Sequence, residues 1–505
     1  MAFLYNWRMS DYRFPAGLGG LRIHLVGAKG TGMAALAEIL ASRGARLTGS
    51  DVADEFYTDV ILRAIGLDLR VGFEAGNLPE ATDLVIHSAA YARDRNPELV
   101  EADRRGLTIL SYPEALGALS ASFDASGIAG VHGKTTTTAM AGSLIAALGL
   151  PATVLAGSAV PSFGGRSTKI LGDAYLVAET CEYRRHFLNF HPRRVVLTSV
   201  ESDHQDYYPT YEDILAAFVE YGLRLPRAGE LIYCADDQGA CAAADRIRAG
   251  RPDLTLTPYG ARAPGPYRME YYRADEGLAR FKLAGFEREF ELRVPGEHLA
   301  LDAAAALALS VSLLCDHRAR VGEGAAKPLV SPAELETLAA ALSAFAGSKR
   351  RSERVGEAGG VLFMDDYGHH PTAIRDTIRG MKAFWPRRRL VVDFMSHTYS
   401  RTKALFGEFV ESLDEADVVV LHKIYASARE APDPSIRGEM LFDAVRRRRT
   451  EKGGDPSTCI YSEEPLAAAG ALADLLRPGD LFLTMGAGDN WKLGERLLEM
   501  KSTKD

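Results

Sequence analysis

The sequence predicts an α/β protein of three domains: a Rossmann-like N-terminal domain, a central P-loop-type ATPase domain with a mostly parallel sheet, and a Rossmann-like C-terminal domain. Two observations predict this class. The chain has 505 residues, which is more than one hydrophobic core usually serves. Apolar runs of strand length alternate with longer helical patterns, which is typical of parallel sheets built from βαβ units. We place the domains at residues 1–122, 123–343 and 344–505.

Composition restricts the classes of function. With 47% hydrophobic and 25% charged residues the chain has the composition of a globular protein, and its net charge of −8 argues against general binding to nucleic acid. The longest apolar run, residues 303–315, is shorter than the roughly 20 residues of a membrane helix and predicts a buried helix. No signal peptide is visible, and five cysteines without a CxxC pair argue against disulfides or zinc. We expect a cytoplasmic monomer or homodimer with no membrane partner.

The first domain opens on one βαβ unit. The stretch "LRIHLVGAKGTGMAALAEILASRGARLTGSD" predicts a strand, a glycine turn, a helix and a second strand that ends at Asp51. A GxGxxA pattern begins at Gly30, and Asp51 lies 21 residues after it, as in the dinucleotide fingerprint. Glycines let the backbone approach a diphosphate at the helix N-terminus. A tight turn without a ligand is the structural alternative.

The second domain begins with "GIAGVHGKTTTT", residues 127–138, in which glycine recurs at every third position before Lys134. A Walker A loop requires glycine six residues before the lysine, where this chain has Ile128. A strand-to-helix junction of this kind can still hold phosphates on backbone N–H groups, bring an ammonium to them and bind Mg2+ through the hydroxyl of Thr135. A helix cap rich in glycine and threonine is the alternative.

Two further strands of the second domain end in polar residues. Glu179 ends "YLVAE", and Asp203 and His204 follow "RRVVLTSV". Because ligands of open α/β sheets bind at the carboxyl ends of the strands, these residues are expected near the loop of Lys134. Together they predict a Mg-nucleotide site. The stretch "GAKPLVSPAELETLAAALSAF" predicts the closing helix of this domain.

The third domain is predicted from the strands "VLFMDDY", "LVVDFMS", "DVVVLHKIY" and "DLFLTMGAG", separated by helical segments. After the first of them, "DDYGHHP" at residues 365–371 gathers two carboxylates, a tyrosine and two histidines. Adjacent histidines point in different directions, so substrate or nucleotide contact is expected here and not a metal site made from these residues alone. The basic run "KRRSER", residues 349–354, is either solvated or faces a triphosphate.

Taken together, these motifs resemble the Mur ligases. The chain carries, in this order along nearly its whole length, "GVHGKTTT", "AETCE", "ESDH", "PGEH", "FAGSKRR", "DDYGHHP", "HTYSRT" and "MGAGD". The family's phosphate loop reads GxxGxxGKT, which accounts for the departure from Walker A. The resemblance implies an ATP-dependent ligase that uses Mg2+ and joins an amino acid, with L-alanine the first expectation, to the carboxylate of UDP-N-acetylmuramate through an acyl phosphate in peptidoglycan synthesis.

The resemblance also implies roles for individual residues. The catalytic residues are Lys134, Glu179 and His204, and the metal ligands are Thr135, Glu179 and His204. The residues expected to bind ATP are Gly130, His132, Gly133, Lys134, Thr135, Thr136, His298, Arg351 and Asp366. Those expected to bind the UDP substrate are Gly30, Gly32, Met33, Ser50, Asp51 and Ser88. Tyr367, His369 and Arg401 are expected to contact the amino acid.

Some positions depart from the family pattern. Thr398 stands where the family has a second arginine of the amino-acid site, and the other departures are Val131, Arg184, Ser199, Leu299 and Asp302. The acceptor therefore stays open between an amino acid and the tripeptide that a related recycling ligase joins to the same nucleotide sugar. An NAD-dependent oxidoreductase built on the GxGxxA turn and Asp51 is a third reading, which leaves Lys134 and Glu179 unexplained.

Overall fold

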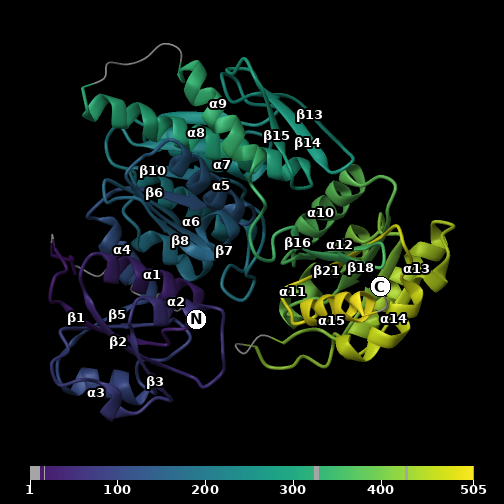
Figure 1. The fold of residues 1–505 in the computed structure, drawn as a ribbon, viewed down its shortest axis with the longest axis horizontal. Helices are drawn as coiled ribbons and strands as arrows, with labels where there is room; N and C mark the ends of the chain where they lie inside the picture. Colours follow the sequence, from purple (N-terminus) through teal and green to yellow (C-terminus); the bar gives the residue numbers. More distant parts are fainter. Residues whose placement is uncertain (1–11, 16, 323–328, 427–429, 504–505) are drawn as a thin grey trace. The chain divides into compact units, whose positions relative to one another are not determined.

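The computed structural model describes residues 12–15, 17–322, 329–426 and 430–503 (Figure 1). Residues 1–11, in which no signal peptide is expected, lie outside the described residues. The chain divides into two compact units, the first made of Met1–Val200, Leu215–Pro258 and Ala305–Val330, and the second of Glu201–Ile214, Tyr259–Ala304 and Ser331–Asp505. In the part of the chain that the structure describes, three of the four sheets consist mostly of parallel strands covered by helices, which confirms the predicted fold class.

The N-terminal sheet has the order β3-β2-β1-β4-β5, with parallel neighbours throughout. Its strands are β1 (Arg22–Val26), β2 (Arg46–Asp51), β3 (Asp68–Val71), β4 (Leu84–His87) and β5 (Thr108–Ser111). Its helices are α1 (Thr31–Ser42), α2 (Thr58–Ala64), α3 (Pro97–Arg104) and α4 (Tyr112–Ser120), with a short 3-10 turn η1 (Ala75–Asn77). The side chain of Asn96 accepts the N–H groups of Glu98 and Leu99, which begins α3. Strand, glycine turn, helix and second strand thus follow one another as predicted.

The central sheet has the order β12-β11-β10-β6-β9-β7-β8. Of its described strand pairs, β7 with β8 is antiparallel and the others are parallel. The strands are β6 (Asp124–Ala129), β7 (Ala152–Val160), β8 (Arg166–Ile170), β9 (Tyr175–Glu179), β10 (Arg194–Leu197), β11 (Glu230–Cys234) and β12 (Thr255–Tyr259). The helical segments are α5 (Lys134–Ala147), η2 (Pro161–Phe163), η3 (Tyr183–Asn189), α6 (Tyr211–Leu223), α7 (Gln238–Gly250) and α8 (Glu297–Arg320). The expected strand-to-helix junction is confirmed as β6 followed by α5.

Helix α8 contains the long apolar run. By length and composition it is the one helix among the described residues that would be able to cross a membrane, but 78% of its apolar window is buried inside the protein. Nearly all of its alanine and leucine side chains are inaccessible to solvent. The expected buried helix is therefore confirmed, and it is longer than the apolar run alone suggests.

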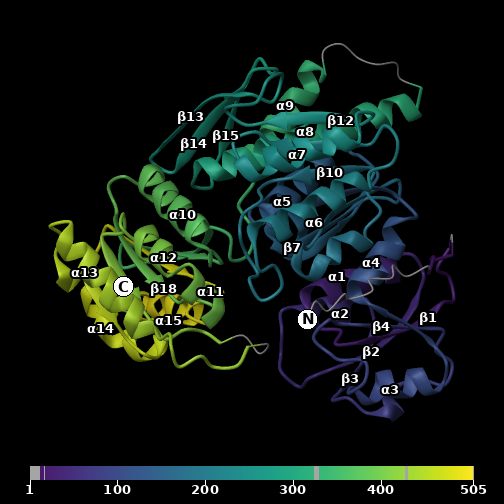
Figure 2. The same cartoon turned by 180° about the vertical axis from the view of Figure 1, so that it is seen from behind.

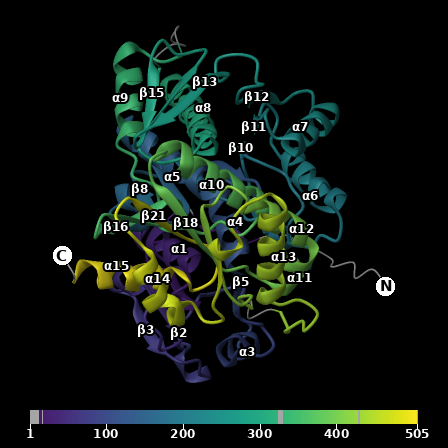
Figure 3. The ribbon, with the colours of Figure 1, turned by 90° about the vertical axis from the view of Figure 1, so that its right-hand side faces the viewer.

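A three-stranded antiparallel sheet in the second unit was not predicted. It consists of β13 (Met269–Asp275), β14 (Leu278–Leu283) and β15 (Glu289–Leu292), and α9 (Pro332–Ser343) lies beside β15 (Figure 3). Ala279, Phe281 and Leu283 of β14 are buried, whereas Arg280 and Lys282 between them carry charge, so the strand has no continuous apolar run. A capping box of Ser331 and Glu334 begins α9, the predicted closing helix.

The C-terminal sheet has the order β16-β17-β21-β18-β19-β20, and β16 alone is antiparallel. The strands are β16 (Glu353–Ala358), β17 (Val361–Asp366), β18 (Arg389–Phe394), β19 (Val418–Leu421), β20 (Cys459–Tyr461) and β21 (Asp480–Met485). The helices are α10 (Pro371–Phe384), α11 (Tyr399–Ala404), α12 (Phe406–Ser412), α13 (Gly438–Glu451), α14 (Ala469–Leu475) and α15 (Trp491–Ser502), with the turns η4 (Pro456–Thr458) and η5 (Pro465–Ala468).

Both faces of this C-terminal sheet are buried. Leu362 and Met364 of β17 belong to a core cluster with residues of α10, α12 and α13, and Phe363 belongs to a second cluster with residues of α14 and α15. The alternation follows the two-residue period of a strand. Figure 2 shows these helices around the sheet. The four strands predicted here from apolar runs are confirmed as β17, β18, β19 and β21.

Candidate active site

The loop between β6 and α5 requires two of its glycines. Gly130 has a φ of +145° and Gly133 a φ of +78°, and L side chains rarely adopt such values. A Cβ atom on Gly130 would also lie 2.0 Å from Oγ1 of Thr198. The third glycine of the repeat, Gly127, lies inside β6, where a Cβ atom would lie 2.2 Å from the hydroxyl oxygen of Tyr221. Gly127 is thus required by packing and not by the loop.

The residues after β10 hold this loop. The N–H of Val131 donates to the carbonyl oxygen of Ser199 at 3.1 Å, and the N–H of His132 donates to its Oγ at 2.9 Å. The hydroxyl of Thr198 donates to the carbonyl of His132. Because the first N–H groups of a helix have no acceptor within it, those of the first turn of α5, which includes Thr135 and Thr136, are suited to an anionic ligand.

Lys134 is held by its own loop and by an acidic neighbour. Its Nζ donates to the carbonyl oxygens of Gly130 at 2.5 Å and Val131 at 3.3 Å, and it lies 2.8 Å from Oε2 of Glu182. Burial lowers the pKa of Lys134, but the carboxylates of Glu182 and Glu179 outweigh burial and raise it above its ordinary value. The site therefore contains a buried ammonium. Glu182 was not predicted, although it lies three residues after Glu179 in the same motif.

Thr135 and Glu179 meet beside the loop. The hydroxyl of Thr135 donates to Oε2 of Glu179 at 2.8 Å. A Cβ atom on Gly157 would lie 2.2 Å from the same oxygen, so this glycine makes room for the carboxylate. Hydroxyl and carboxylate oxygens are the hard donors that Mg2+ prefers. Of the three expected metal ligands, the first unit brings these two together, whereas His204 belongs to the second unit.

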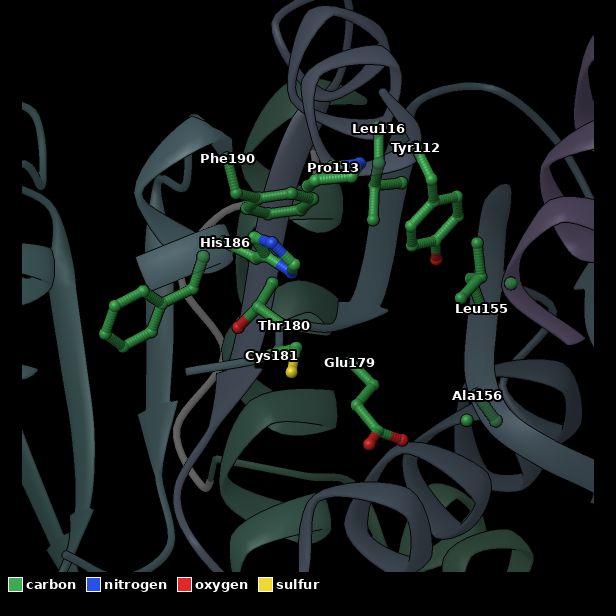
Figure 4. A pocket seen from close by; sticks show the side chains of 13 residues that line it. Tyr112, Pro113, Leu116, Leu155, Ala156, Glu179, Thr180, Cys181, His186 and Phe190 are labelled. Carbon is green, nitrogen blue, oxygen red and sulfur yellow. The ribbon is translucent and has the colours of Figure 1, made fainter. Parts of the chain in front are cut away.

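A cavity of about 130 Å³ lies next to Glu179 (Figure 4). Its walls are mainly apolar and aromatic, and they include Tyr112, Leu155 and Phe190. In Figure 4 the side chain of Glu179 stands at one side of this space, below the ring of Tyr112. Burial, the main cause, together with the charge of Glu179 raises the pKa of Tyr112 above its usual range.

The residues expected to bind the UDP substrate surround the turn after β1, at two depths. Gly30 directly precedes α1 and borders open space, because the heavy atom nearest to an added Cβ would be 3.9 Å away. Asp51 accepts the N–H of Lys29 at 2.6 Å and thereby shapes the same turn. Met33 and Ser50 are buried in the domain core, and the Ser50 hydroxyl donates to Glu98 at 2.5 Å. Met33 and Ser50 therefore pack beneath the turn, and their side chains are not exposed to a ligand.

The remaining UDP-site residues lie close to aromatic rings. A Cβ atom on Gly32 would lie 2.7 Å from Cζ of Tyr112. The N–H of Ser88 donates to the carbonyl of Val26 at the end of β1, and the ring of Tyr91 approaches within 2.5 Å of a Cβ placed on Gly27. The strand ends of the first sheet therefore meet around this turn, as the fingerprint predicts.

In the second unit, Arg401 is paired with Asp203, which the sequence predicted near the loop of Lys134 and not among the residues that contact the amino acid. Nε of Arg401 donates to Oδ1 of Asp203 at 2.9 Å, and both side chains are buried. Burial raises the pKa of Asp203, but the charges of Arg401 and His204 outweigh burial and hold it well below its usual range. The guanidinium expected to bind an amino-acid carboxylate therefore already has a protein carboxylate beside it.

Two histidines of the same unit flank Arg401. Nδ1 of His397 lies 3.3 Å from Nη1 of Arg401, and the rings of His369 and His397 are 6.1 Å apart. Burial, with the charge of Arg401, lowers the pKa of His397 to about 4 and that of His369 well below its usual value. Both imidazoles are thus neutral at physiological pH. Thr398, which replaces the family's arginine, precedes α11 with a φ of +69°.

The remaining residues expected to bind the nucleotide, Asp366, Arg351 and His298, have structural partners. Asp366 accepts the N–H groups of Ser352 and Gly368, both at 2.7 Å. The guanidinium of Arg351 lies over the ring of Tyr367, 5.1 Å from its centroid. His298 stands at the start of α8, where its ring approaches within 2.3 Å of a Cβ placed on Gly296. The basic run and the "DDYGHHP" motif are therefore in direct contact.

Comparison with protein families yields three matches along the chain. Residues 22–124 match the Mur ligase family catalytic domain, residues 128–310 the Mur ligase middle domain, and residues 350–488 the Mur ligase glutamate ligase domain. The chain is 52% identical to a UDP-N-acetylmuramate–L-alanine ligase of Treponema pallidum, over 96% of this chain and 97% of the relative. It is 39% identical to the enzyme of the same name from Desulfitobacterium hafniense, over 95% of this chain and 99% of the relative.

Solved structures show the same likeness. A crystal structure of UDP-N-acetylmuramate–alanine ligase from Thermotoga maritima matches with a TM-score of 0.72 at 25% identity and covers 96% of this chain and 100% of its own. A murein peptide ligase from Psychrobacter arcticus matches with a TM-score of 0.62 at 23% identity, over 96% and 99% of the two chains. The second likeness concerns the fold alone.

Proposed function

The chain belongs to the Mur ligase family, and on this basis we propose that it joins L-alanine to the carboxylate of UDP-N-acetylmuramate in peptidoglycan precursor synthesis, with conversion of ATP to ADP and phosphate. The observation that carries this proposal is the 52% identity to an L-alanine ligase over 96% of the chain. The loop that presents Lys134 beside Thr135 and Glu179 supports it, because these residues suit phosphoryl transfer.

The first step brings two anions together. A muramoyl carboxylate oxygen forms a bond to the γ-phosphorus of ATP, and the bond from that phosphorus to the β-phosphate oxygen breaks, which yields an acyl phosphate and ADP. The ammonium of Lys134 compensates the charge that develops on the transferred group. Thr135, Glu179 and His204 would hold Mg2+, which when bound would neutralise phosphate charge. The N–H groups at Gly133, Lys134 and Thr136 would orient the phosphates.

In the second step the amine nitrogen of L-alanine attacks the acyl carbon. The new C–N bond replaces the bond to phosphate, and the amine loses a proton. Arg401 would bind the α-carboxylate, with Tyr367 and His369 beside it. Because Arg401 is paired with Asp203 at 2.9 Å in the structure, the amino acid would have to share or replace that partner.

The two nucleotides are proposed to bind different domains. Gly30, Gly32, Asp51 and Ser88 would contact UDP-N-acetylmuramate, and the buried Met33 and Ser50 would shape that turn. Gly130, His132, His298, Arg351 and Asp366 would complete the ATP site. We keep the domain limits at 122/123 and 343/344 as part of the proposal; α4 ends at Ser120 and α9 at Ser343. A cytoplasmic monomer or homodimer remains part of the proposal.

Phosphate release tests this function. The protein is incubated with ATP, Mg2+ and UDP-N-acetylmuramate, and the rate is compared among L-alanine, glycine, L-serine and the cell-wall tripeptide. We expect release that requires both UDP-N-acetylmuramate and L-alanine. Turnover with the tripeptide but not with L-alanine would identify a recycling ligase instead.

A further inference from the structure

We propose that Glu182 is a positioning residue that acts as the counter-ion of Lys134: it holds the lysine ammonium before nucleotide binds and gives it up to the terminal phosphates of ATP. The inference deepens the proposed function and rests on it, because it takes ATP to be the nucleotide at this loop. The expected site residues include Lys134 but not Glu182.

The contacts of the Lys134 ammonium carry this inference. Three oxygen atoms surround this ammonium: the carbonyl oxygens of Gly130 and Val131 accept its N–H groups, at 2.5 and 3.3 Å, and Oε2 of Glu182 is its ion-pair partner at 2.8 Å. A phosphate oxygen that binds this ammonium must therefore displace or share one of these acceptors. Of the three, only Glu182 carries a charge that the phosphate would replace in kind.

Burial strengthens the ion pair between Lys134 and Glu182, so replacing the carboxylate of Glu182 by a phosphate has a large energetic effect. The side chain of Lys134 is 12% exposed and that of Glu182 is 4% exposed. In such an environment an ion without its partner is costly, so the ammonium is stable only beside an anion. Before nucleotide binds, Glu182 is that anion. A triphosphate brought to the loop both competes with this carboxylate and is repelled by it.

The backbone after β9 fixes where this carboxylate lies. The N–H of Arg185 donates to the carbonyl of Glu182 at 2.9 Å, and the N–H of Phe187 donates to that of Cys181 at 2.8 Å. Arg184 and Arg185 have φ values of +51° and +59°, which non-glycine residues rarely adopt because they are strained there. The fold accepts this strain directly after Glu182.

Side-chain contacts maintain the same turn. Arg185 pairs with Glu220 of α6 at 2.5 Å. The ring of Phe187 stacks on that of Tyr221, with centroids 4.6 Å apart. A carboxylate held in place from both the backbone and the neighbouring helix is preorganised to receive the ammonium, which is what a positioning residue requires.

Binding of ATP to the Glu182→Gln variant tests the inference. Titration calorimetry measures the dissociation constant for ATP with Mg2+ and without the other substrates. The amide keeps the size of the side chain but removes the competing charge, so ATP is expected to bind about tenfold more tightly, the change that one charge-assisted contact produces. A side chain with a merely structural role would have the opposite effect, because its loss would weaken binding. The rate constant kcat is expected to fall, since the ammonium is then less well confined.

Two variants complete the design. Glu182→Asp keeps the charge on a side chain one methylene shorter, and its dissociation constant is expected to fall between those of the wild type and the Gln variant. If the Gln variant does not fold, tighter ATP binding by Glu182→Asp than by the wild type decides the question. Asp245→Asn makes the same chemical change, from carboxylate to amide, on an exposed side chain of α7 that pairs with Arg248, and should leave ATP affinity as it is.

Unchanged or weaker ATP binding by folded Glu182→Gln, or no shift in Glu182→Asp, would overturn the inference. The proposed function fails separately. If the wild type binds ATP but shows no turnover with UDP-N-acetylmuramate and L-alanine, the ligase assignment is wrong, and the effect of Glu182 on ATP affinity is still measured in the same titration.

Discussion

Each charged residue of the candidate site lies against a neighbour that controls it. Glu182 holds Lys134, Gly157 makes room for Glu179, and Asp203 pairs with Arg401. Because these groups are buried, a change in the neighbour alters the charge or the position of the functional group itself. Substitutions at the site therefore need controls that separate chemistry from packing.

Lys134→Ala is expected to lower kcat about a hundredfold to a thousandfold, because the charge on the transferred phosphoryl group is then poorly compensated. Phosphate release measures the rate, and circular dichroism checks the fold. Lys492→Ala on α15, which removes a side chain that is 49% exposed, is the matched control and should retain the wild-type rate. Near-wild-type turnover of Lys134→Ala would remove this loop from the reaction.

Gly30→Ala is expected to raise the KM for UDP-N-acetylmuramate about tenfold while the KM for ATP stays the same, because a Cβ would stand where the diphosphate approaches the backbone. The protein itself accommodates this methyl group, since the nearest heavy atom lies 3.9 Å away and φ is −56°. Gly32→Ala is a poorer probe, because its Cβ would meet the Tyr112 ring at 2.7 Å and disturb packing. A rise in the KM for ATP alone would show that the two nucleotide sites were assigned to the wrong domains.

Thr398→Arg is expected to lower the KM for L-alanine about tenfold, since a second guanidinium adds one charge-assisted contact to the carboxylate. The substitution also removes a β-branched residue from a φ of +69°, where branching is unfavourable. Thr398→Asn separates the two effects, because asparagine tolerates this backbone but has no charge. Equal KM values in the Arg and Asn variants would exclude a charge contribution at this position.

At the level of elements, strand ends bring the chemistry together. Ser199, just after β10, accepts a hydrogen bond from His132 in the loop after β6. Glu179, which ends β9, accepts a hydrogen bond from the hydroxyl of Thr135 in the first turn of α5. Parallel neighbours make this possible, because their carboxyl ends lie at the same edge of the sheet. In the C-terminal sheet the same principle joins β18 and β19 through a buried ion pair.

That pair predicts a pH dependence of stability. Nε2 of His422 lies 2.6 Å from Oδ1 of Asp393, and both are buried. Burial lowers the pKa of His422, but Asp393 outweighs burial and raises it above its ordinary value. A raised folded-state pKa adds stability that is complete below the unfolded pKa of about 6.5 and is lost as pH rises through the folded value, at about 1.4 kcal/mol per pKa unit of displacement.

The free energy of unfolding of the wild type should therefore decrease above about pH 6.5 relative to that of His422→Gln, which lacks the titrating group. Urea unfolding at intervals from pH 5 to pH 9 measures both curves. Curves that stay parallel over this range would show that folding does not change the pKa of His422.

At the scale of the whole molecule, the chain passes between its two compact units several times, so neither unit is a continuous segment. A ligand that binds the folded protein should therefore raise the free energy of unfolding of the whole chain. ADP at a hundred times its dissociation constant is expected to raise the free energy of unfolding by about 2.7 kcal/mol. Differential scanning calorimetry with and without ADP measures this shift, and Lys134→Ala should show a smaller one at the same concentration. No shift in the wild type would contradict nucleotide binding to the free protein.

Much of the fold follows from the sequence alone. Continuous apolar runs of strand length are local signals, and they correctly identify β1, β9, β10 and the main strands of the C-terminal sheet. The loop around Lys134 was recognisable because left-handed positions require glycine, and such requirements appear directly in the residue order. The family, and with it the class of reaction, was recognisable from the order of short motifs.

Other features were decided only by the tertiary structure. The sheet of β13, β14 and β15 was missed because its strands mix buried aromatic residues with surface charges and give no continuous apolar run. The pairing of Glu182 with Lys134 joins residues 48 positions apart, and that of Asp203 with Arg401 joins residues 198 positions apart. Residue order reports local backbone requirements, but which charges neutralise one another depends on which strand ends the sheets bring together and on how deeply they are buried.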